Sequence, residues 1–296
     1  MNISVIICSV NRAEILHQTV ASISAQRQKP AEVLVVTPGP QHVLPETLEI
    51  PDVRLVLGSL GLPSQRNVGL DQIKCGCDLV AFFDDDIELS EFYLEEMARL
   101  FSKREDILIA SGKLIHDGGR STILTRIQAK KLCDAYDQSQ AHSDMPGRYS
   151  PADSAYGCNM VVRYSAARKV RFDETLPLYA WLEDRDYSHR VTKHLRAPVE
   201  LESAVAVHLG SRSGRIGGVR MGFSEVINPI YLWAKNRTFS LRHLVVQYWI
   251  RCFVGNVLGI LTRDSEYDRM GLLRGNLIGF WHLLKGSWDP GHIREI

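Results

Sequence analysis

The chain has 296 residues, 45% of them hydrophobic and 23% charged, and a formal net charge of +1. These proportions are those of a globular protein and rule out the disordered and fibrous classes, while near-neutrality argues against a dedicated nucleic-acid binder. The length suits one large domain, or one domain with an appendage.

The first half of the chain alternates strand and helix patterns. Residues 3–8, 33–36 and 53–56 are short β-branched apolar runs, as expected for strands buried on both faces. Between the first two runs, apolar residues recur on one helical face from Ile15 to Ile23. This order predicts parallel strands that are covered by helices on both faces.

A turn over residues 61–69 opens the next predicted helix, and residues 79–83 form a fourth strand that ends in three aspartates. In parallel sheets of this kind, ligands bind at the carboxyl ends of the strands. Asn11 and Arg12 follow the first strand, so we expect them to line the same crevice as the aspartates.

Residues 111–151 show weak periodicity, and we expect a variable insertion over the crevice there. Residues 157–162 resume a strand and are followed by a helix. The acidic run Glu183-Asp184-Arg185-Asp186 leads into another helix, and residues 205–208 form the last predicted strand.

The composition of the chain changes after His208. Residues 210–222 form a loop rich in glycine and arginine, and two apolar helical stretches follow, at about 227–262 and 269–284. From Leu209 onward there are twelve Lys or Arg but only six Asp or Glu, which favours an anionic partner such as a phosphate or a lipid surface. Charged residues interrupt both stretches, so we expect helices at a membrane interface rather than a true span. A helical pair folded onto the main domain is the alternative.

The N-terminus runs directly into a strand-like segment, with no basic stretch ahead of an apolar run. We therefore expect no signal peptide, and six cysteines kept reduced in the cytoplasm. Cys75 and Cys77 lack the two further ligands that a zinc site needs.

The triplet Asp84-Asp85-Asp86 follows the fourth strand. Three neighbouring carboxylates repel one another unless they are solvated or a cation neutralises them, and hard oxygen ligands select Mg²⁺ or Mn²⁺. A solvated acidic turn is the alternative. The position at the centre of the sheet favours the metal.

Two further features could serve chemistry near such a cation. An acid at Glu183 or Asp184 could remove a proton from an attacking hydroxyl, although acidic residues at a helix start also complement the helix dipole. His208 ends a strand just before an arginine-rich loop, which makes it a candidate third metal ligand beside a diphosphate site.

Taken together, four segments resemble family 2 glycosyltransferases of the GT-A fold, in order and in spacing. The likeness covers roughly residues 1–210. The four segments are Ser4–Arg12, Gln65–Gly69, Phe82–Asp86 and Glu183–Asp186.

The resemblance implies an α/β GT-A domain over residues 1–215, with a Rossmann-like, mostly parallel sheet flanked by helices. The apolar stretches beyond it predict a C-terminal amphipathic helical region over 216–296, which could associate with a membrane. The resemblance also implies a nucleotide-sugar donor, a divalent cation and inversion at the anomeric carbon. Asp184 would be the general base, with Glu183 beside it. Asp86 and His208 would hold the metal. The donor would be contacted by Asn11, Arg12, Arg66, Asn67, Asp84, Asp85, Arg212 and Arg215.

This chain departs from the family pattern at two places. It has Cys8-Ser9-Val10-Asn11-Arg12 where the family usually has Pro-Thr-x-Asn-Arg. The family also usually places a nucleobase-reading aspartate after the second strand, where this chain has Val36-Thr37-Pro38-Gly39. We expect UDP as the nucleotide, with GDP and dTDP as alternatives.

The sequence therefore predicts an inverting, metal-dependent hexosyltransferase, peripheral on the cytoplasmic face of the membrane. The basic, aromatic tail favours a lipid-linked saccharide acceptor in polysaccharide or glycoconjugate assembly, or else a homo-oligomer interface. An inactive scaffold module and a sugar nucleotidyltransferase are the alternatives. The latter usually has a glycine-rich basic segment after its first strand, which this chain lacks.

Overall fold

The computed structural model describes residues 1–74, 76–119, 121–139, 147–193, 196–212, 216–264 and 267–296. The chain divides into two compact units. The sheet unit comprises Met1–Leu60, Ser64–Phe172 and Tyr187–Gly214, and the helical unit comprises Gly61–Pro63, Asp173–Asp186 and Arg215–Ile296.

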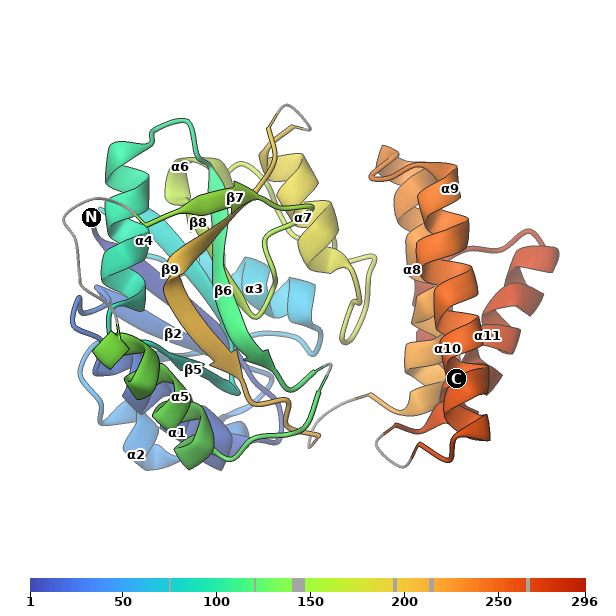
Figure 1. Cartoon of the computed structure of the whole chain (residues 1–296), viewed down its shortest axis with the longest axis horizontal. Coiled ribbons are helices and arrows are strands. Elements are labelled where there is room, and N and C mark those ends of the chain that lie inside the picture. The colour runs from blue at the N-terminus through green and yellow to red at the C-terminus, as the bar shows by residue number, and fades with distance from the viewer. Residues whose placement is uncertain (75, 120, 140–146, 194–195, 213–215, 265–266) are drawn as a thin grey trace. The chain divides into compact units, whose positions relative to one another are not determined.

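The sheet unit is built on one sheet whose described strands run in the order β3-β2-β1-β4-β8-β6-β9-β5, with β7 also paired to β9 (Figure 1). The strands are β1 (Ile3–Cys8), β2 (Glu32–Thr37), β3 (Val53–Leu57), β4 (Leu79–Asp84), β5 (Ile87–Leu89), β6 (Ile109–Asp117), β7 (Tyr149–Pro151), β8 (Asn159–Arg163) and β9 (Val199–His208).

The first four strands are parallel, as the sequence predicts, and the α/β class is confirmed. Antiparallel pairing begins at β8, which lies between β4 and β6. The structure differs from the sequence prediction at the last strand and at the expected insertion. The last strand begins at Val199 rather than at Val205. Residues 109–117 are a strand inside the sheet, so the expected insertion is wrong there.

Helices cover both faces of this sheet (Figure 1). Val5 and Ile7 pack in one apolar cluster with α1 (Ala13–Ser24) and α4 (Tyr93–Lys103). Ile6 points to the other cluster, with residues of α3 (Leu62–Asp71), α6 (Tyr164–Ala167) and α7 (Glu183–Val191). This alternation is the two-residue period of a strand that is buried on both faces. The shorter helices η1 (Pro40–His42) and α2 (Pro45–Leu48) and the longer α5 (Arg126–Ser139) complete the unit.

The helical unit contains α8 (Gly218–Asn236), α9 (Leu241–His243), the π-helical η2 (Leu244–Ile250), α10 (Arg251–Leu261), α11 (Arg269–Leu284) and the short η3 (Pro290–Glu295). Two apolar stretches were predicted, and the first is divided. Arg237 takes a left-handed conformation, with φ 51°, and ends α8. Ser240 then caps α9, whose helix continues through η2 into α10.

Helices α8 and α11 approach closely through glycines. A Cβ atom built on Gly222 would lie 2.0 Å from the carbonyl oxygen of Leu272, and one on Gly275 would lie 2.1 Å from that of Val219. Only glycine fits at these two positions, so the backbones themselves are in contact there.

Candidate active site

The carboxyl end of β4 gathers the three aspartates. Asp84 is the last residue of β4, and Asp85 and Asp86 form the turn into β5. Strand β5 pairs antiparallel with β9, and this register sets His208 opposite Ile87. The end of β9 therefore brings His208 beside the triplet, although 121 residues separate it from Ile87 in the chain.

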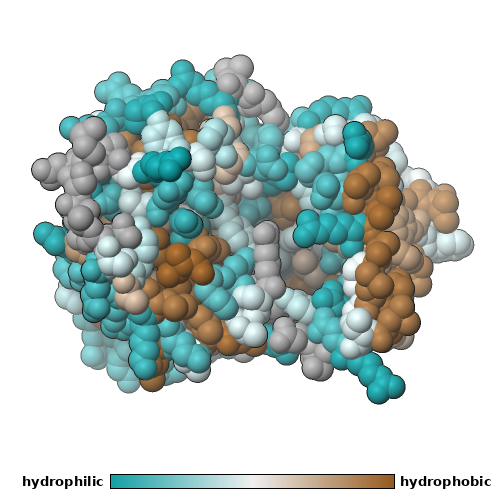
Figure 2. All heavy atoms as spheres, viewed as in Figure 1, coloured by the Kyte–Doolittle hydropathy of each residue, from teal (hydrophilic) through white to brown (hydrophobic). Residues whose placement is uncertain are grey.

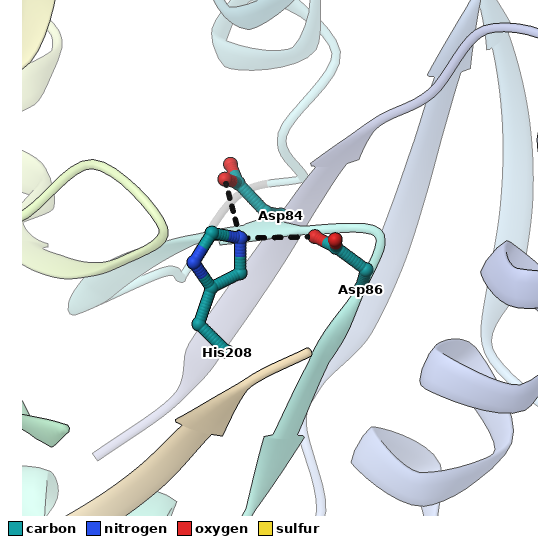
Figure 3. A group of neighbouring side chains, drawn as sticks. All are labelled: Asp84, Asp86 and His208. Atoms are coloured by element: carbon teal, nitrogen blue, oxygen red, sulfur yellow. Dashed lines mark ion pairs between the residues drawn. The ribbon is translucent and has the colours of Figure 1, made fainter. Parts of the chain in front are cut away.

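Asp84, Asp86 and His208 form a compact cluster (Figure 3). The His208 Nε2 atom lies 3.3 Å from Asp86 Oδ1 and 4.0 Å from Asp84 Oδ2. One ligand atom from each residue lies within 4.8 Å of the others. Two carboxylates and an imidazole at this spacing suit a divalent cation that also binds phosphate oxygens.

Asp117, at the end of β6, orients His208. Its Oδ1 atom lies 2.9 Å from His208 Nδ1, and it also accepts hydrogen bonds from the Gly119 amide and the Tyr156 hydroxyl. Because a carboxylate only accepts, the Nδ1 atom must carry the proton, which leaves the Nε2 atom to face Asp84 and Asp86. Metal-binding histidines are typically held in this way by a carboxylate behind the ring.

The electrostatics of the cluster favour a cation. Burial alone would raise the pKa of Asp86, but hydrogen bonds from His208 and the Ser211 amide and the charge of Arg12 lower it to about 2. Burial would likewise lower the pKa of His208, yet its bonds to Asp117 and Asp86 raise it to about 10. The cluster therefore holds a positive charge on the imidazole when no metal neutralises the carboxylates, and its residues fit a metal.

Asp85 has different partners from its two neighbours. Its fully buried carboxylate lies 2.6 Å from Arg12 Nη2 and accepts a hydrogen bond from the Ser9 hydroxyl. Burial raises the pKa of Asp85 to about 7, against the opposing charge of Arg12. Arg12 also lies 3.6 Å from Asp86, so its guanidinium contacts both aspartates of the turn between β4 and β5.

The other predicted donor-binding residues occupy different settings. Arg66 is buried on α3, lies 3.6 Å from Asp84 and packs on the rings of Phe82 and Phe172. Asn67 exchanges two hydrogen bonds with the backbone of Phe172, so its amide fastens that segment.

Asn11 and Arg212 are exposed, and Asn11 has a φ of 59°. Arg215 lies outside the described residues.

The predicted base belongs to the helical unit. Glu183 and Asp184 form the first turn of α7, and Asp184 Oδ1 accepts a hydrogen bond from the Arg185 amide. Ahead of them Leu178, Ala180 and Leu182 all have φ between 53° and 73°. Left-handed conformations at non-glycine residues cost energy and concentrate at functional sites. Nothing in the residue types of this segment predicts that conformation.

Comparison with known proteins agrees with this geometry. A family model described as "Glycosyl transferase family 2" matches residues 4–170. Two solved structures of residues 1–349 of S. aureus TarS are similar to the chain, one of them in complex with UDP-GlcNAc. Both have a TM-score of 0.55 and identities of 14% and 15%, and each comparison covers 93% of this chain and 79% of that chain. At such identities the likeness concerns the fold. No curated protein matches the sequence.

Proposed function

The chain belongs to glycosyl transferase family 2, and on that premise we propose that it transfers a sugar from a nucleotide-sugar donor to a hydroxyl acceptor, with inversion and with a divalent cation. The resemblance and the GT-A fold expected from the sequence are confirmed. The cluster of Asp84, Asp86 and His208 at the sheet's ligand-binding end carries the proposal.

Asp84, Asp86 and His208 would hold Mn²⁺ or Mg²⁺. When bound, this cation supplies positive charge that neutralises the diphosphate leaving group. Arg66, which lies beside Asp84, adds a permanent positive charge to the same edge of the sheet. Asn11, Arg12, Arg212 and Arg215 remain the proposed donor contacts around it, together with Asp85 and Asn67.

The acceptor hydroxyl needs a base, because its own pKa lies far above neutrality. We assign Asp184 as that base, with Glu183 beside it. Asp184 takes the hydroxyl proton while the oxygen forms its bond to the anomeric carbon. The bond from that carbon to the diphosphate oxygen breaks on the opposite face, and the diphosphate leaves with the electron pair.

UDP is the proposed nucleotide. The TarS structure that holds UDP-GlcNAc shares this chain's fold, which supports a uridine donor. The stretch Val36–Gly39, which spans the end of β2, carries no carboxylate to read a base, so GDP and dTDP donors remain alternatives.

We place the enzyme at the cytoplasmic face of the membrane, acting on a lipid-linked saccharide in polysaccharide or glycoconjugate assembly. Within the described residues, the helix Leu241–Leu261 is long enough and apolar enough to cross a membrane. Only 22% of its most apolar window is buried inside the protein, so most of that window is free to contact lipid. Apolar side chains cover this helix (Figure 2), and Val246, Ile250, Val254 and Leu258 are exposed at near four-residue spacing. The charged side chains between Leu241 and Leu261 are Arg242 and Arg251. This composition suits an interfacial helix on anionic lipid.

A thermal-shift panel tests the donor site. UDP-GlcNAc, a GDP-sugar and a dTDP-sugar are each added with and without Mn²⁺, to the natural protein and to Asp86→Ala. A ligand that binds only the folded state raises the melting temperature by mass action, so we expect a shift from the uridine donor that needs both Mn²⁺ and Asp86. Asp134→Ala, an exposed carboxylate on α5, is the matched control and should behave as the natural protein.

Two other outcomes would overturn the assignment. If none of the nucleotide sugars changes the melting temperature, an inactive scaffold is favoured. The absence of a carboxylate after β2 would then explain the lack of donor binding. A shift that survives Asp86→Ala places the donor elsewhere.

A further inference from the structure

The segment that carries the predicted base clusters with the C-terminal helices. Residues Asp173–Asp186 belong to the helical unit, although the chain on both sides of them belongs to the sheet unit. Glu183 and Asp184 lie near the end of this segment, which we call the base segment.

Helix α8 contacts the base segment at its start, middle and end. At the start, the Tyr231 hydroxyl and Lys235 Nζ donate to Asp173 Oδ2, at 2.7 and 2.5 Å. In the middle, Asn228 Nδ2 donates to the carbonyl oxygen of Trp181, at 2.9 Å.

The contacts at the end lie two residues beyond Asp184. The buried Asp186 carboxylate accepts a hydrogen bond of 2.7 Å from Asn236 Nδ2, and Lys235 Nζ lies 3.4 Å from it. Lys235 thus bridges the two ends of the segment through the carboxylates of Asp173 and Asp186.

Asn228, Tyr231 and Lys235 lie on one face of α8, because their spacing follows the three- and four-residue steps that align side chains along a helix. Asn236, the next residue after Lys235, adds the remaining contact from the end of the helix. One rigid helix face therefore holds both ends and the middle of a segment whose backbone is strained at Leu178, Ala180 and Leu182.

Apolar packing reinforces the polar contacts. Leu176 and Ala180 of the base segment are buried in a cluster with Leu232, Phe239 and Leu244. The Trp181 ring meets the Tyr248 ring edge-on, with 5.6 Å between centroids.

We infer that α8 positions the general base, with Asn228, Tyr231, Lys235 and Asn236 as positioning residues. The inference rests on the proposed role of Asp184. It gives the C-terminal helices a part in the reaction itself, in addition to any contact with lipid.

The first test is a double-mutant cycle on the hydrolysis of UDP-GlcNAc in Mn²⁺, with water in place of the acceptor. Lys235→Met removes the ammonium and keeps most of the apolar stem. We expect kcat to fall about 10- to 100-fold with KM unchanged, since displacing a catalytic group by about 1 Å costs that much. In an Asp184→Asn background the same change should cost less than about threefold, because the base it positions is already lost. Lys235→Arg should restore most of kcat.

The cycle separates the two ways of failing. Full activity in Asp184→Asn overturns the base assignment and the inference with it. An inactive Asp184→Asn beside a fully active Lys235→Met overturns the inference alone. If Lys235→Met lowers kcat by the same factor with Asp184 and with Asp184→Asn, the effect is a general structural one, and this result also overturns the inference. If Lys235→Met does not fold, Tyr231→Phe replaces it, since it removes one hydroxyl donor to Asp173 and keeps the ring.

The second test needs no activity. Amide hydrogen exchange across residues 173–186 should quicken in Lys235→Met and in Tyr231→Phe. Lys285→Met is the matched control, because this exposed lysine lies over the ring of Trp281, which is outside the base segment. Unchanged exchange in both α8 variants would overturn the inference and leave the proposed function untouched.

Discussion

At the scale of single residues, the part played by His208 depends on a carboxylate that does not face the proposed cation. A neutral imidazole offers one lone pair, and the proton on the other nitrogen decides which way that lone pair points. Asp117 fixes the proton on Nδ1 and is itself held by the Gly119 amide and the Tyr156 hydroxyl. The affinity of the proposed cation for His208 therefore depends partly on Asp117, which would not contact the cation itself.

We predict that Asp117→Ala weakens Mn²⁺ binding about 10- to 100-fold, the usual cost of losing such a partner. Asp117→Asn keeps an acceptor for the ring and should lose less. Isothermal titration with Mn²⁺ measures both, and Asp134→Ala serves again as the exposed control. Equal affinity in Asp117→Ala and the natural protein would show that the ring needs no support.

The sequence leads to His208 but not to Asp117. A histidine at a strand end beside an arginine-rich loop is a visible signal, whereas Asp117 becomes relevant only through the pairing of β6 with β9. Strand β6 itself escapes prediction for a physical reason. A Cβ atom on Gly112 would lie 2.2 Å from the Ala204 carbonyl oxygen and 2.3 Å from the Tyr93 ring, so a small residue is needed there and the apolar pattern is broken.

At the scale of helices and strands, the buried parallel strands were predictable because their apolar runs are continuous. The segment before Glu183 was not, because it is held by hydrogen bonds from α8, which lies far along the chain and leaves no mark on the residue types of the segment.

The contact between α8 and α11 should be intolerant of even a methyl group. We predict that Gly275→Ala lowers the free energy of unfolding by about 1–3 kcal/mol, since its Cβ atom would meet the Val219 carbonyl. Gly255→Ala on α10 is the matched control, because nothing lies within 4 Å of its added Cβ. It should stabilise the protein by up to about 1 kcal/mol, as alanine favours a helix. Urea unfolding compares the two, and a Gly275→Ala variant as stable as Gly255→Ala would contradict the packing.

A buried acid joins three helices of the same unit. Glu225 Oε2 on α8 accepts hydrogen bonds from Asn256 on α10 and Asn276 on α11. Burial raises the pKa of Glu225, although these bonds and the charge of Arg269 oppose the rise. In the pH range between its ordinary and raised values the folded chain holds a proton that the unfolded chain has lost. Stability from this group is therefore fully present at lower pH and declines as pH rises through that range.

We predict that Glu225→Gln removes this decline, because an amide oxygen can accept the same bonds without ionising. Relative to the natural protein, the variant should gain stability as the pH rises above the ordinary range of a glutamate pKa, by roughly 1.4 kcal/mol for each unit by which the pKa is raised. Urea unfolding at several pH values measures the gain, with the exposed Glu295→Gln as control. A gain that does not depend on pH would contradict the assignment.

At the scale of the whole molecule, the sequence changes after His208 to a basic tail with two apolar helical stretches, and the predicted domain boundary lies at residue 215. The two compact units are not divided at a single point in the chain, because Asp173–Asp186 belongs with the C-terminal helices. No shift in composition marks that segment. The predicted domain boundary remains a prediction.

The charge asymmetry leads to a prediction for lipid. We expect the protein to sediment with vesicles that contain phosphatidylglycerol and less with phosphatidylcholine alone, and added salt should weaken binding because the attraction is screened. Leu258→Glu should reduce binding at least about tenfold, since it removes an exposed apolar side chain from the stripe on α10. Ile127→Glu is the matched control, at another exposed apolar position, on α5. Dimers that dissociate in Leu258→Glu, with no lipid binding by the natural protein, would instead identify this stripe as a subunit interface.

The different partners of the three aspartates have a consequence for how these positions can change among relatives. Asp84 and Asp86 are constrained by what they would bind, so an exchange at either should appear only together with a change in chemistry. Asp85 and Arg12 are constrained by each other as well as by the proposed donor, because the two form a largely buried ion pair. Among relatives, positions 12 and 85 should therefore vary as a pair, with a neutral couple replacing the charged one, while the residues on either side of position 85 stay fixed. The three adjacent aspartates would then be conserved for two different reasons.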